Sequence, residues 1–369
     1  MSFSAWTLCR RAMDAVSIGR SLLRAAIGQP PLDRLTADSY NRWFSAATAG
    51  RVIPALIEVA GKTEPDLTGP QWEELIAVDR AVQARSLHLE NQLSAIAQVL
   101  DARDIEYAAL KGSATAHLDY PSPAARQLGD IDILVRPESL QMAETHLSAA
   151  GWFRAYGLPG GHEKFTHAIT LRDRTNVELD VHQAIAHRAV GLRVPTSELL
   201  SRAERYALPR STQLALCAND RFLHAAVHLG TADPAHRRLS SMADVLLLAH
   251  SPEVDPFATF SSAAEWRLSW LVVRALKIAF RSAEMDVPDR WMSAIEVIPP
   301  RDDLLIRLAY RAASRRAVIE ELAYLRLLSK RDAFRYLRGY MRPDDLYRSS
   351  HGRGPVAQSR YLARKALGK

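Results

Sequence analysis

A short alternating segment, residues 130–135 (DIDILV), constrains the fold more than any other part of the sequence. Its closely spaced aliphatic residues favour a β-strand. Side chains two positions apart on a strand share a face, so we expect Asp130 and Asp132 side by side, with Cα atoms roughly 6.6 Å apart. Ile131 and Ile133 then point to the opposite side. The segment therefore predicts a sheet with one acidic face and one face buried in a hydrophobic core.

Two carboxylates held on one rigid strand repel each other, and a bound divalent cation relieves the repulsion. A further acid is available on a later β-prone run, where Glu178, Asp180 and His182 alternate and share one face. If the two strands are neighbours, three acids converge. We expect Asp180 to join Asp130 and Asp132, with Glu178 as the alternative and His182 as a supporting or packed residue. Oxygen ligands suit Mg²⁺ or Mn²⁺, and three acids can hold two such ions. Solvated acids on an exposed strand are the alternative interpretation.

A possible phosphate-binding turn precedes this segment, where a short apolar run ends at Lys111-Gly112-Ser113. Backbone N–H groups and a serine hydroxyl in such a turn can hold phosphate oxygens, and glycine allows close approach of the backbone. Lys111 and Arg126 add positive charge. The alternatives are that Lys111 lies on the surface, and that Arg126 pairs structurally with Asp119 or another carboxylate.

The apolar spacing changes twice along the chain, which predicts an α+β protein. Residues 1–100 have helical spacing, residues 101–190 contain short β-prone runs, and the spacing from about 197 onward is helical again. Two runs, 168–171 and 177–181, flank a polar loop and predict a hairpin. We therefore expect an N-terminal helical region at 1–100, a small mixed-sheet core at 101–190, a C-terminal helical domain at 191–344 and a basic tail at 345–369.

Composition excludes several protein classes. The 48 Lys and Arg against 41 Asp and Glu give a net charge of +7, which weakly favours anionic partners. Two cysteines are too few for a disulfide framework or a thiolate zinc site, and no apolar run is long enough to span a membrane. We expect a cytoplasmic protein. The chain lacks the phosphate-binding loop of P-loop proteins, the dinucleotide-binding fingerprint and the nucleophile elbow of serine hydrolases.

Taken in order, these motifs resemble the nucleotidyltransferase superfold typified by DNA polymerase beta. More narrowly, Lys-Gly-Ser at 111–113, Arg126, Gly-Asp-Ile-Asp at 129–132 and Asp-Val-His at 180–182 are similar to a bacterial family of uncharacterised nucleotidyltransferases. The resemblance implies a nucleotidyltransferase core between N-terminal helices and a C-terminal helical region. It also implies transfer of a nucleoside monophosphate from an NTP to an acceptor, with release of pyrophosphate and a two-metal mechanism. ATP is the expected nucleotide.

The resemblance also implies roles for individual residues. Catalysis and binding of Mg²⁺ or Mn²⁺ would fall to Asp130, Asp132 and Asp180. Binding of the nucleotide would fall to Lys111, Gly112, Ser113 and Arg126. Members of the family also carry a His-rich helix followed by an Asp-containing helix, which here correspond to His224, His228 and Asp244. We expect the two histidines to be core or interface residues rather than metal ligands.

The acceptor is left open and is a small molecule, a peptide or RNA. Two other functions are compatible with the same residues. One is a non-catalytic nucleotide-binding or interaction module, such as an antitoxin-like protein or a scaffold. The other is an RNA-directed transferase that uses the basic tail, which salt-sensitive RNA binding would reveal.

Overall fold

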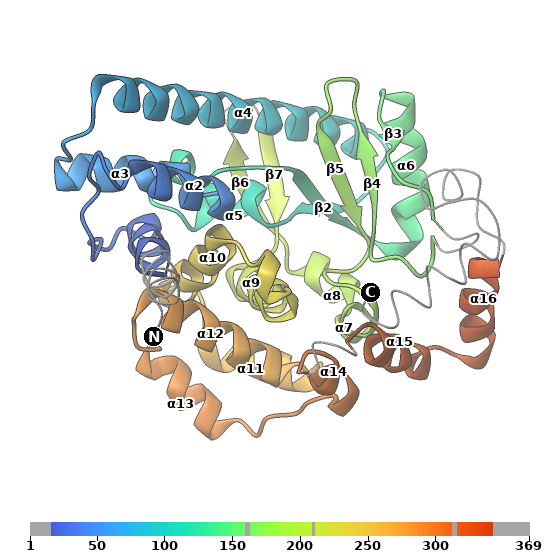
Figure 1. Ribbon diagram of the computed structural model, residues 1–369. Coiled ribbons are helices and arrows are strands. Elements are labelled where there is room, and N and C mark those ends of the chain that lie inside the picture. The colour runs from blue at the N-terminus through green and yellow to red at the C-terminus, as the bar shows by residue number, and fades with distance from the viewer. Residues whose placement is uncertain (1–15, 159–162, 209–210, 312–315, 342–369) are drawn as a thin grey trace.

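A seven-stranded mixed sheet forms the middle of the computed structural model, which describes residues 16–158, 163–208, 211–311 and 316–341 (Figure 1). The strand order is β3-β4-β5-β2-β1-β7-β6. The strands are β1 (Tyr107–Ala109), β2 (Ile131–Val135), β3 (Phe153–Arg154), β4 (Ala168–Arg172), β5 (Glu178–His182), β6 (Glu204–Leu208) and β7 (Ser211–Ala215).

The middle of the sheet brings together strands that are far apart in the sequence. Strand β2 lies between β1, to which it is antiparallel, and β5, to which it is parallel. Strands β4 and β5 form the antiparallel hairpin that the sequence predicts, with Ala168 opposite His182 and Arg172 opposite Glu178. Because β2 and β5 run in parallel, their residues at the same height face the same side of the sheet.

One face of the sheet is covered by the long helix α4 (Gly69–Asp101) and by α6 (Leu140–Ala149), which lie along it in Figure 1. Helix α4 begins with a capping box, in which Thr68 and Gln71 each satisfy a backbone N–H of the other. Its apolar stripe includes Leu89 and Leu93 and packs in one buried cluster with Ile133 of β2. The aliphatic positions of the strands therefore form the core on this side, as the alternation predicts.

The other face of the sheet is turned toward most of the other helices, whose buried residues form a second, larger hydrophobic cluster. Within it, Phe222 of α9 (Ala218–Thr231) stacks on Trp291 of α13 (Asp289–Val297), with ring centroids 4.2 Å apart. The N-terminal part contributes a helix over 16–26, α2 (Tyr40–Gly50) and α3 (Ile53–Thr63). The other helices are α5 (Gly112–Leu118), α7 (Arg188–Arg193), α8 (Thr196–Ser201), α10 (Leu239–His250), α11 (Pro256–Glu265), α12 (Ser269–Ala283), α14 (Leu304–Ala309), α15 (Arg316–Leu327) and α16 (Lys330–Met341).

The sheet extends further along the chain than the sequence predicts. Helical spacing was expected from about residue 197, but Glu204–Leu208 (β6) and Ser211–Ala215 (β7) pair as antiparallel strands, and β7 joins the sheet in parallel beside β1. The expectation is wrong for this segment because the burial of β6 has a period of two, with Tyr206 and Leu208 buried and Arg205 and Ala207 exposed. The fold is α+β as expected. The domain boundaries remain a prediction, and the predicted tail at 345–369 lies outside the described residues.

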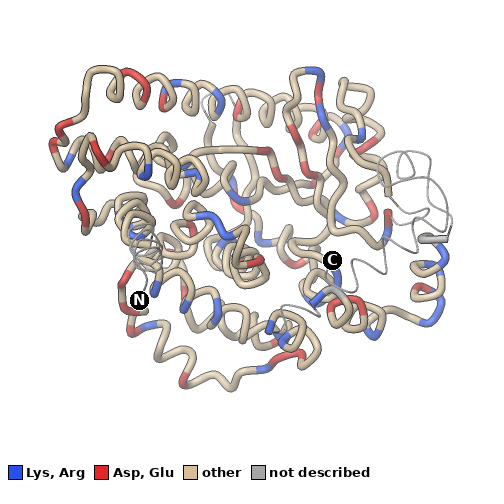
Figure 2. The backbone as a smooth tube through the Cα atoms, in the orientation of Figure 1, with Lys and Arg blue, Asp and Glu red and all other residues tan. Residues whose placement is uncertain are grey.

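No helix in the described part of the chain is long and apolar enough to cross a membrane. Positively and negatively charged residues are interspersed along the chain, as Figure 2 shows. A local cluster of charges of one sign therefore stands out from the rest of the molecule.

Candidate active site

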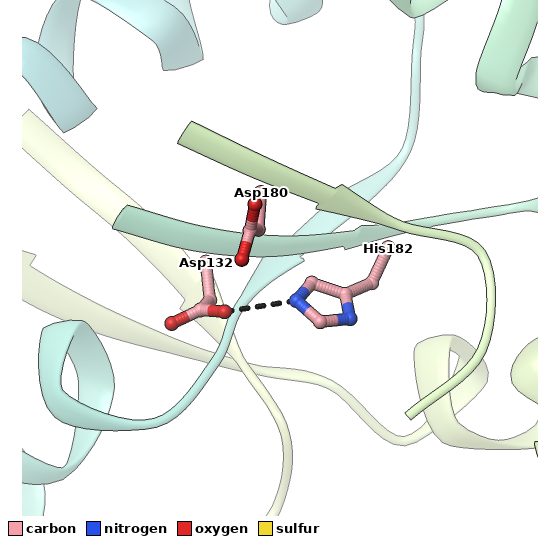
Figure 3. A group of neighbouring side chains, drawn as sticks. All are labelled: Asp132, Asp180 and His182. Carbon is pink, nitrogen blue, oxygen red and sulfur yellow. Dashed lines mark hydrogen bonds and ion pairs between the residues drawn. The ribbon is translucent and has the colours of Figure 1, made fainter. Parts of the chain in front are cut away.

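The parallel pairing of β2 and β5 places Asp132 directly beside Asp180. His182 follows two residues later on β5 and shares their face, which is opposite to the face packed on α4. One ligand atom from each of the three side chains lies within 4.8 Å of the others. Figure 3 shows the three side chains gathered on the same side of the two strands. The three side chains form a cluster that we call the Asp-Asp-His group. Two carboxylates and one imidazole at this spacing can hold a divalent metal ion.

Asp132 is the most buried acid of the group, with 2% of its side chain exposed. Its Oδ1 atom accepts hydrogen bonds from Lys111 Nζ at 2.5 Å and from His182 Nε2 at 2.8 Å. Burial alone would raise the pKa of Asp132, but the Lys111 ammonium and His182 outweigh it and hold the pKa well below its ordinary value. Asp132 is therefore ionised at neutral pH.

The surroundings of Asp180 shift its pKa in the opposite direction to that of Asp132. It is half-buried and accepts a hydrogen bond from Thr170 Oγ1 at 2.6 Å. Burial raises the pKa of Asp180, the Thr170 hydrogen bond opposes that effect, and the charge of Asp132 adds to it. His182 and Lys111 also favour the charged form of Asp180, but together with Thr170 they do not offset burial and the charge of Asp132, and a bound cation would add to their effect.

Glu178, the alternative third acid, lies outside the Asp-Asp-His group. It forms an ion pair with Arg172 across the β4–β5 hairpin. Of the two acids that the sequence leaves open on this strand, only Asp180 lies beside Asp132.

Asp130 is not placed as the alternation predicts. Strand β2 begins at Ile131, and Asp130 lies in a bend before it, outside the Asp-Asp-His group. The expectation of a strand position is wrong because ladder pairing with β5 starts only at Ile131. Asp130 instead lines a neighbouring cavity, 3.9 Å from the guanidinium of Arg51. Burial and the charge of Asp132 raise its pKa.

Lys111 connects the Asp-Asp-His group to that cavity. It lies between β1 and α5 with φ +47° and ψ −134°, a backbone conformation that is costly for a residue with a side chain. This strained position directs the ammonium to Asp132. Gly112 also lines the cavity, and a Cβ there would lie 2.9 Å from the Leu128 side chain. Ser113 is buried outside the cavity lining, and its carbonyl accepts a hydrogen bond from the Tyr206 hydroxyl at 3.0 Å.

The cavity has a volume of about 100 Å³ and a lining dominated by positive charge. Its five basic residues are Arg51, Lys111, Arg126, Arg221 and Arg238, against two acids, Asp130 and Asp244. This excess favours an anionic ligand such as a phosphate chain. Sequence reasoning did not find Arg51 and Arg238, because they lie outside the motifs, at the end of α2 and before α10.

Arg51 packs against the Gly-Asp-Ile-Asp motif at Gly129, which has no side chain. A Cβ at Gly129 would lie 2.1 Å from Arg51 Nη1, so only glycine leaves room for the guanidinium there. Gly129 in the motif was therefore a signal that another side chain packs against the backbone there. It did not indicate that this side chain is Arg51.

Arg126 makes the structural contact that the sequence leaves as an alternative. Its guanidinium donates two hydrogen bonds to Asp244 of α10, at 2.8 Å and 2.9 Å, and Tyr120 donates to the same carboxylate at 2.8 Å. The partner is Asp244 rather than Asp119, which pairs with the buried Arg221. Arg126 lines the cavity as well, so its expected contact with phosphate remains a prediction.

His224 and His228 lie on the wall of the same cavity, one helical turn apart on α9. His224 is 3% exposed, and its Nε2 has no hydrogen-bond partner among the described residues. Burial, followed by the charge of Lys111, lowers its pKa well below the ordinary value, so the ring is neutral. Neither histidine belongs to the Asp-Asp-His group.

Comparison with known proteins identifies a family for this chain. A nucleotidyltransferase-like protein from Paracoccidioides brasiliensis, solved as a crystal structure of an antigenic protein, is similar at 16% identity with a TM-score of 0.34, over 57% of this chain and 94% of that chain. No curated protein matches the sequence. The family described as uncharacterised nucleotidyltransferase matches residues 38–283, a range that contains the Asp-Asp-His group and the whole cavity lining. The chain belongs to this uncharacterised nucleotidyltransferase family.

Proposed function

We propose that the protein transfers a nucleoside monophosphate from an NTP, in a reaction that depends on a divalent metal ion, to an acceptor that carries a hydroxyl group. The acceptor oxygen forms a bond to the α-phosphorus, the bond from that phosphorus to the bridging oxygen breaks, and pyrophosphate leaves with the electron pair. One observation carries the proposal. The register of β2 and β5 sets Asp132 and Asp180 side by side, and Lys111, which donates to Asp132, lines a cavity rich in positive charge.

The acidic residues would have different roles, because they differ in burial and in the charges around them. Asp132 and Asp180 fit a divalent cation, and Asp130 is the additional acid that the sequence predicts for the same role. A bound Mg²⁺ or Mn²⁺ supplies neutralisation of phosphate charge. Asp180, whose pKa is raised by burial and by Asp132, is the acid best suited to orient the acceptor hydroxyl and to take its proton at a carboxylate oxygen.

The basic residues would hold the phosphate chain. Lys111 lies between the acidic pair and the cavity, where negative charge develops on the departing pyrophosphate. Arg51 and Arg238 extend the positive wall, and Gly112 allows phosphate oxygens to approach the backbone. We assign this contact to Lys111 and Gly112 rather than to Ser113, because the Ser113 side chain is buried outside the cavity lining. Catalysis is then mainly positioning and charge stabilisation.

Calorimetric titration and pyrophosphate release test the proposal together. A non-hydrolysable ATP analogue should bind in Mg²⁺ and lose most of its affinity in EDTA. With a low-molecular-weight cell extract as acceptor, wild type should release pyrophosphate. Equal affinity in EDTA would contradict the metal site, and tight binding without pyrophosphate release would identify a binding module instead.

A matched pair of variants distinguishes the effect of losing the Asp180 carboxylate from the effect of disturbing strand β5. Asp180→Asn should abolish pyrophosphate release, whereas Glu178→Gln, on the same face of the same strand, should leave it within about twofold. Glu178 is the appropriate control because it pairs with Arg172 and lies outside the Asp-Asp-His group. Equal losses in both variants would show that the strand, rather than the Asp180 carboxylate, is being perturbed.

A further inference from the structure

A second and larger cavity opens beyond the ends of β4 and β5. Its volume is about 880 Å³, within the range of pockets that enclose small molecules. The walls come from α6, the segment before β4, the segment after β5, α7 and α15. None of its lining residues lines the basic cavity, so the two are separate spaces.

A continuous chain of side chains connects the two cavities through the Asp-Asp-His group. Lys111 lines the basic cavity and donates to Asp132, and His182 contacts the same carboxylate oxygen. The His182 ring meets the His167 ring edge to face, with centroids 5.4 Å apart, and His167 lines the second cavity. Asp132 therefore lies in a chain of side-chain contacts that leads from one cavity to the other. A transferase with two substrates needs such an arrangement, with one substrate on each side of the reacting atoms.

The charges of the second cavity differ from those of the first. Three acids and three bases line it, compared with two acids and five bases in the basic cavity. The three bases already have acidic partners: Arg154 contacts Glu144 and Glu163, Lys164 contacts Asp332, and Arg188 contacts Glu321.

Apart from His167, the remaining lining is uncharged and partly apolar. Apolar side chains such as Leu140, Leu192 and Phe165 complete the walls. A balanced lining of this kind does not compensate a polyanion, whereas an uncharged or zwitterionic molecule loses little electrostatic solvation on entering it.

We propose that the second cavity is the acceptor site and that it takes a hydroxyl-bearing small molecule without net negative charge. The proposal rests on the nucleotidyl transfer proposed above. It predicts that RNA and other anionic acceptors are poor substrates, and that the NTP and the acceptor bind on opposite sides of Asp132 and Asp180.

Filling the cavity tests this assignment. Gln141 on α6 lines the cavity and is exposed, so Gln141→Trp should narrow the cavity without disturbing a core. Leu192→Trp narrows it from α7, where Leu192 is 50% exposed. Met142→Trp is the matched control, because Met142 follows Gln141 on the same helix, is 44% exposed and does not line the cavity.

The assay uses a low-molecular-weight cell extract divided on an anion exchanger into unbound and bound fractions. Wild type should release pyrophosphate from ATP with the unbound fraction. Gln141→Trp and Leu192→Trp should lower that rate about tenfold or more, whereas Met142→Trp should not. All four proteins should bind the Mg²⁺–ATP analogue with the same affinity, because the basic cavity is unchanged. Turnover with the anionic fraction alone, or full turnover by both filled variants, would overturn the proposal.

A binding measurement keeps the two proposals distinguishable. Saturation-transfer NMR with the same fractions should give signals from neutral or zwitterionic compounds that weaken in Gln141→Trp and persist in Met142→Trp. If wild type releases no pyrophosphate with either fraction, nucleotidyl transfer fails as a proposal, and these signals alone then decide whether the cavity binds such molecules. Absence of signals from the unbound fraction, or equal signals in both variants, would refute the cavity assignment.

Discussion

Replacing Asp132 by asparagine tests whether attraction or repulsion dominates at the paired acids. Repulsion from Asp180 alone would make the variant as stable as wild type or more stable. The geometry predicts the opposite, because Asp132 is 2% exposed and accepts hydrogen bonds from Lys111 and His182. Removing one partner of a buried ion pair costs about 3–5 kcal/mol. Since the Lys111 side chain is 26% exposed and can regain water, we expect about 3 kcal/mol, the lower end of that range.

Urea denaturation of the protein without added metal gives the free energy of unfolding for wild type and Asp132→Asn. Adding Lys111→Met to the variant removes the ammonium that has lost its partner. The double variant should therefore be more stable than the sum of the two single changes predicts, by about 1–3 kcal/mol. An Asp132→Asn protein as stable as wild type would show that repulsion dominates and that the Lys111 contact contributes no net stability.

The pH dependence of the difference in unfolding free energy between wild type and Asp132→Asn provides a second check. Because Lys111 and His182 hold the folded-state pKa of Asp132 below its ordinary value, its contribution is present above the unfolded-state pKa, about 4. The contribution is lost as the pH falls through the folded-state value. The stability gap between wild type and Asp132→Asn should therefore be constant from pH 7 to about 5 and close progressively below about 4. A gap that widens on acidification would refute the sign of this argument.

Three further predictions follow from contacts around the site. Asp180→Asn should leave the metal-free protein as stable as wild type or more stable, since burial and the neighbouring acid raise the pKa of Asp180 and its charged form is costly at neutral pH; a clear drop in Tm would contradict this. Asp244→Asn should cost about 3 kcal/mol in urea denaturation, because it leaves the buried Arg126 without its charged partner, and an unchanged midpoint would contradict that reasoning. Gly129→Ala should displace the Arg51 guanidinium and weaken binding of the Mg²⁺–ATP analogue several-fold in calorimetry with little change in Tm, whereas unchanged affinity would remove Arg51 from the phosphate site.

Local patterns in the sequence were sufficient to predict β2 and the β4–β5 hairpin. The alternation around Asp132 and around Asp180 indicated two strands with acids on one side, and both strands are present. The prediction failed where local patterns are weak. Short, partly exposed strands such as β6 carry only a few alternating positions, so their period is hard to distinguish from a helical one. Strand boundaries are similarly imprecise, which is why Asp130 falls outside β2.

Which residues lie next to each other across distant segments could be learned only from the tertiary structure. No local pattern states that β2 and β5 are parallel neighbours, yet only this register sets Asp132 beside Asp180 and separates Glu178 from them. Arg126 shows the same limit. Its charge is evident from the sequence, but its partner, Asp244, is more than a hundred residues away.

The chain's own sequence thus determined which residues carry charge, which faces of the strands are apolar, and that a glycine-bearing turn precedes an acidic strand, because these properties depend on neighbours within a few positions. The tertiary structure decided which charges meet. It brought Arg51 over Gly129, joined His182 to the acidic pair, and connected this group through Lys111 to a basic cavity and through His167 to a charge-balanced one. Electrostatic interactions depend on distance and burial, and both are set by packing between segments that are far apart in the chain.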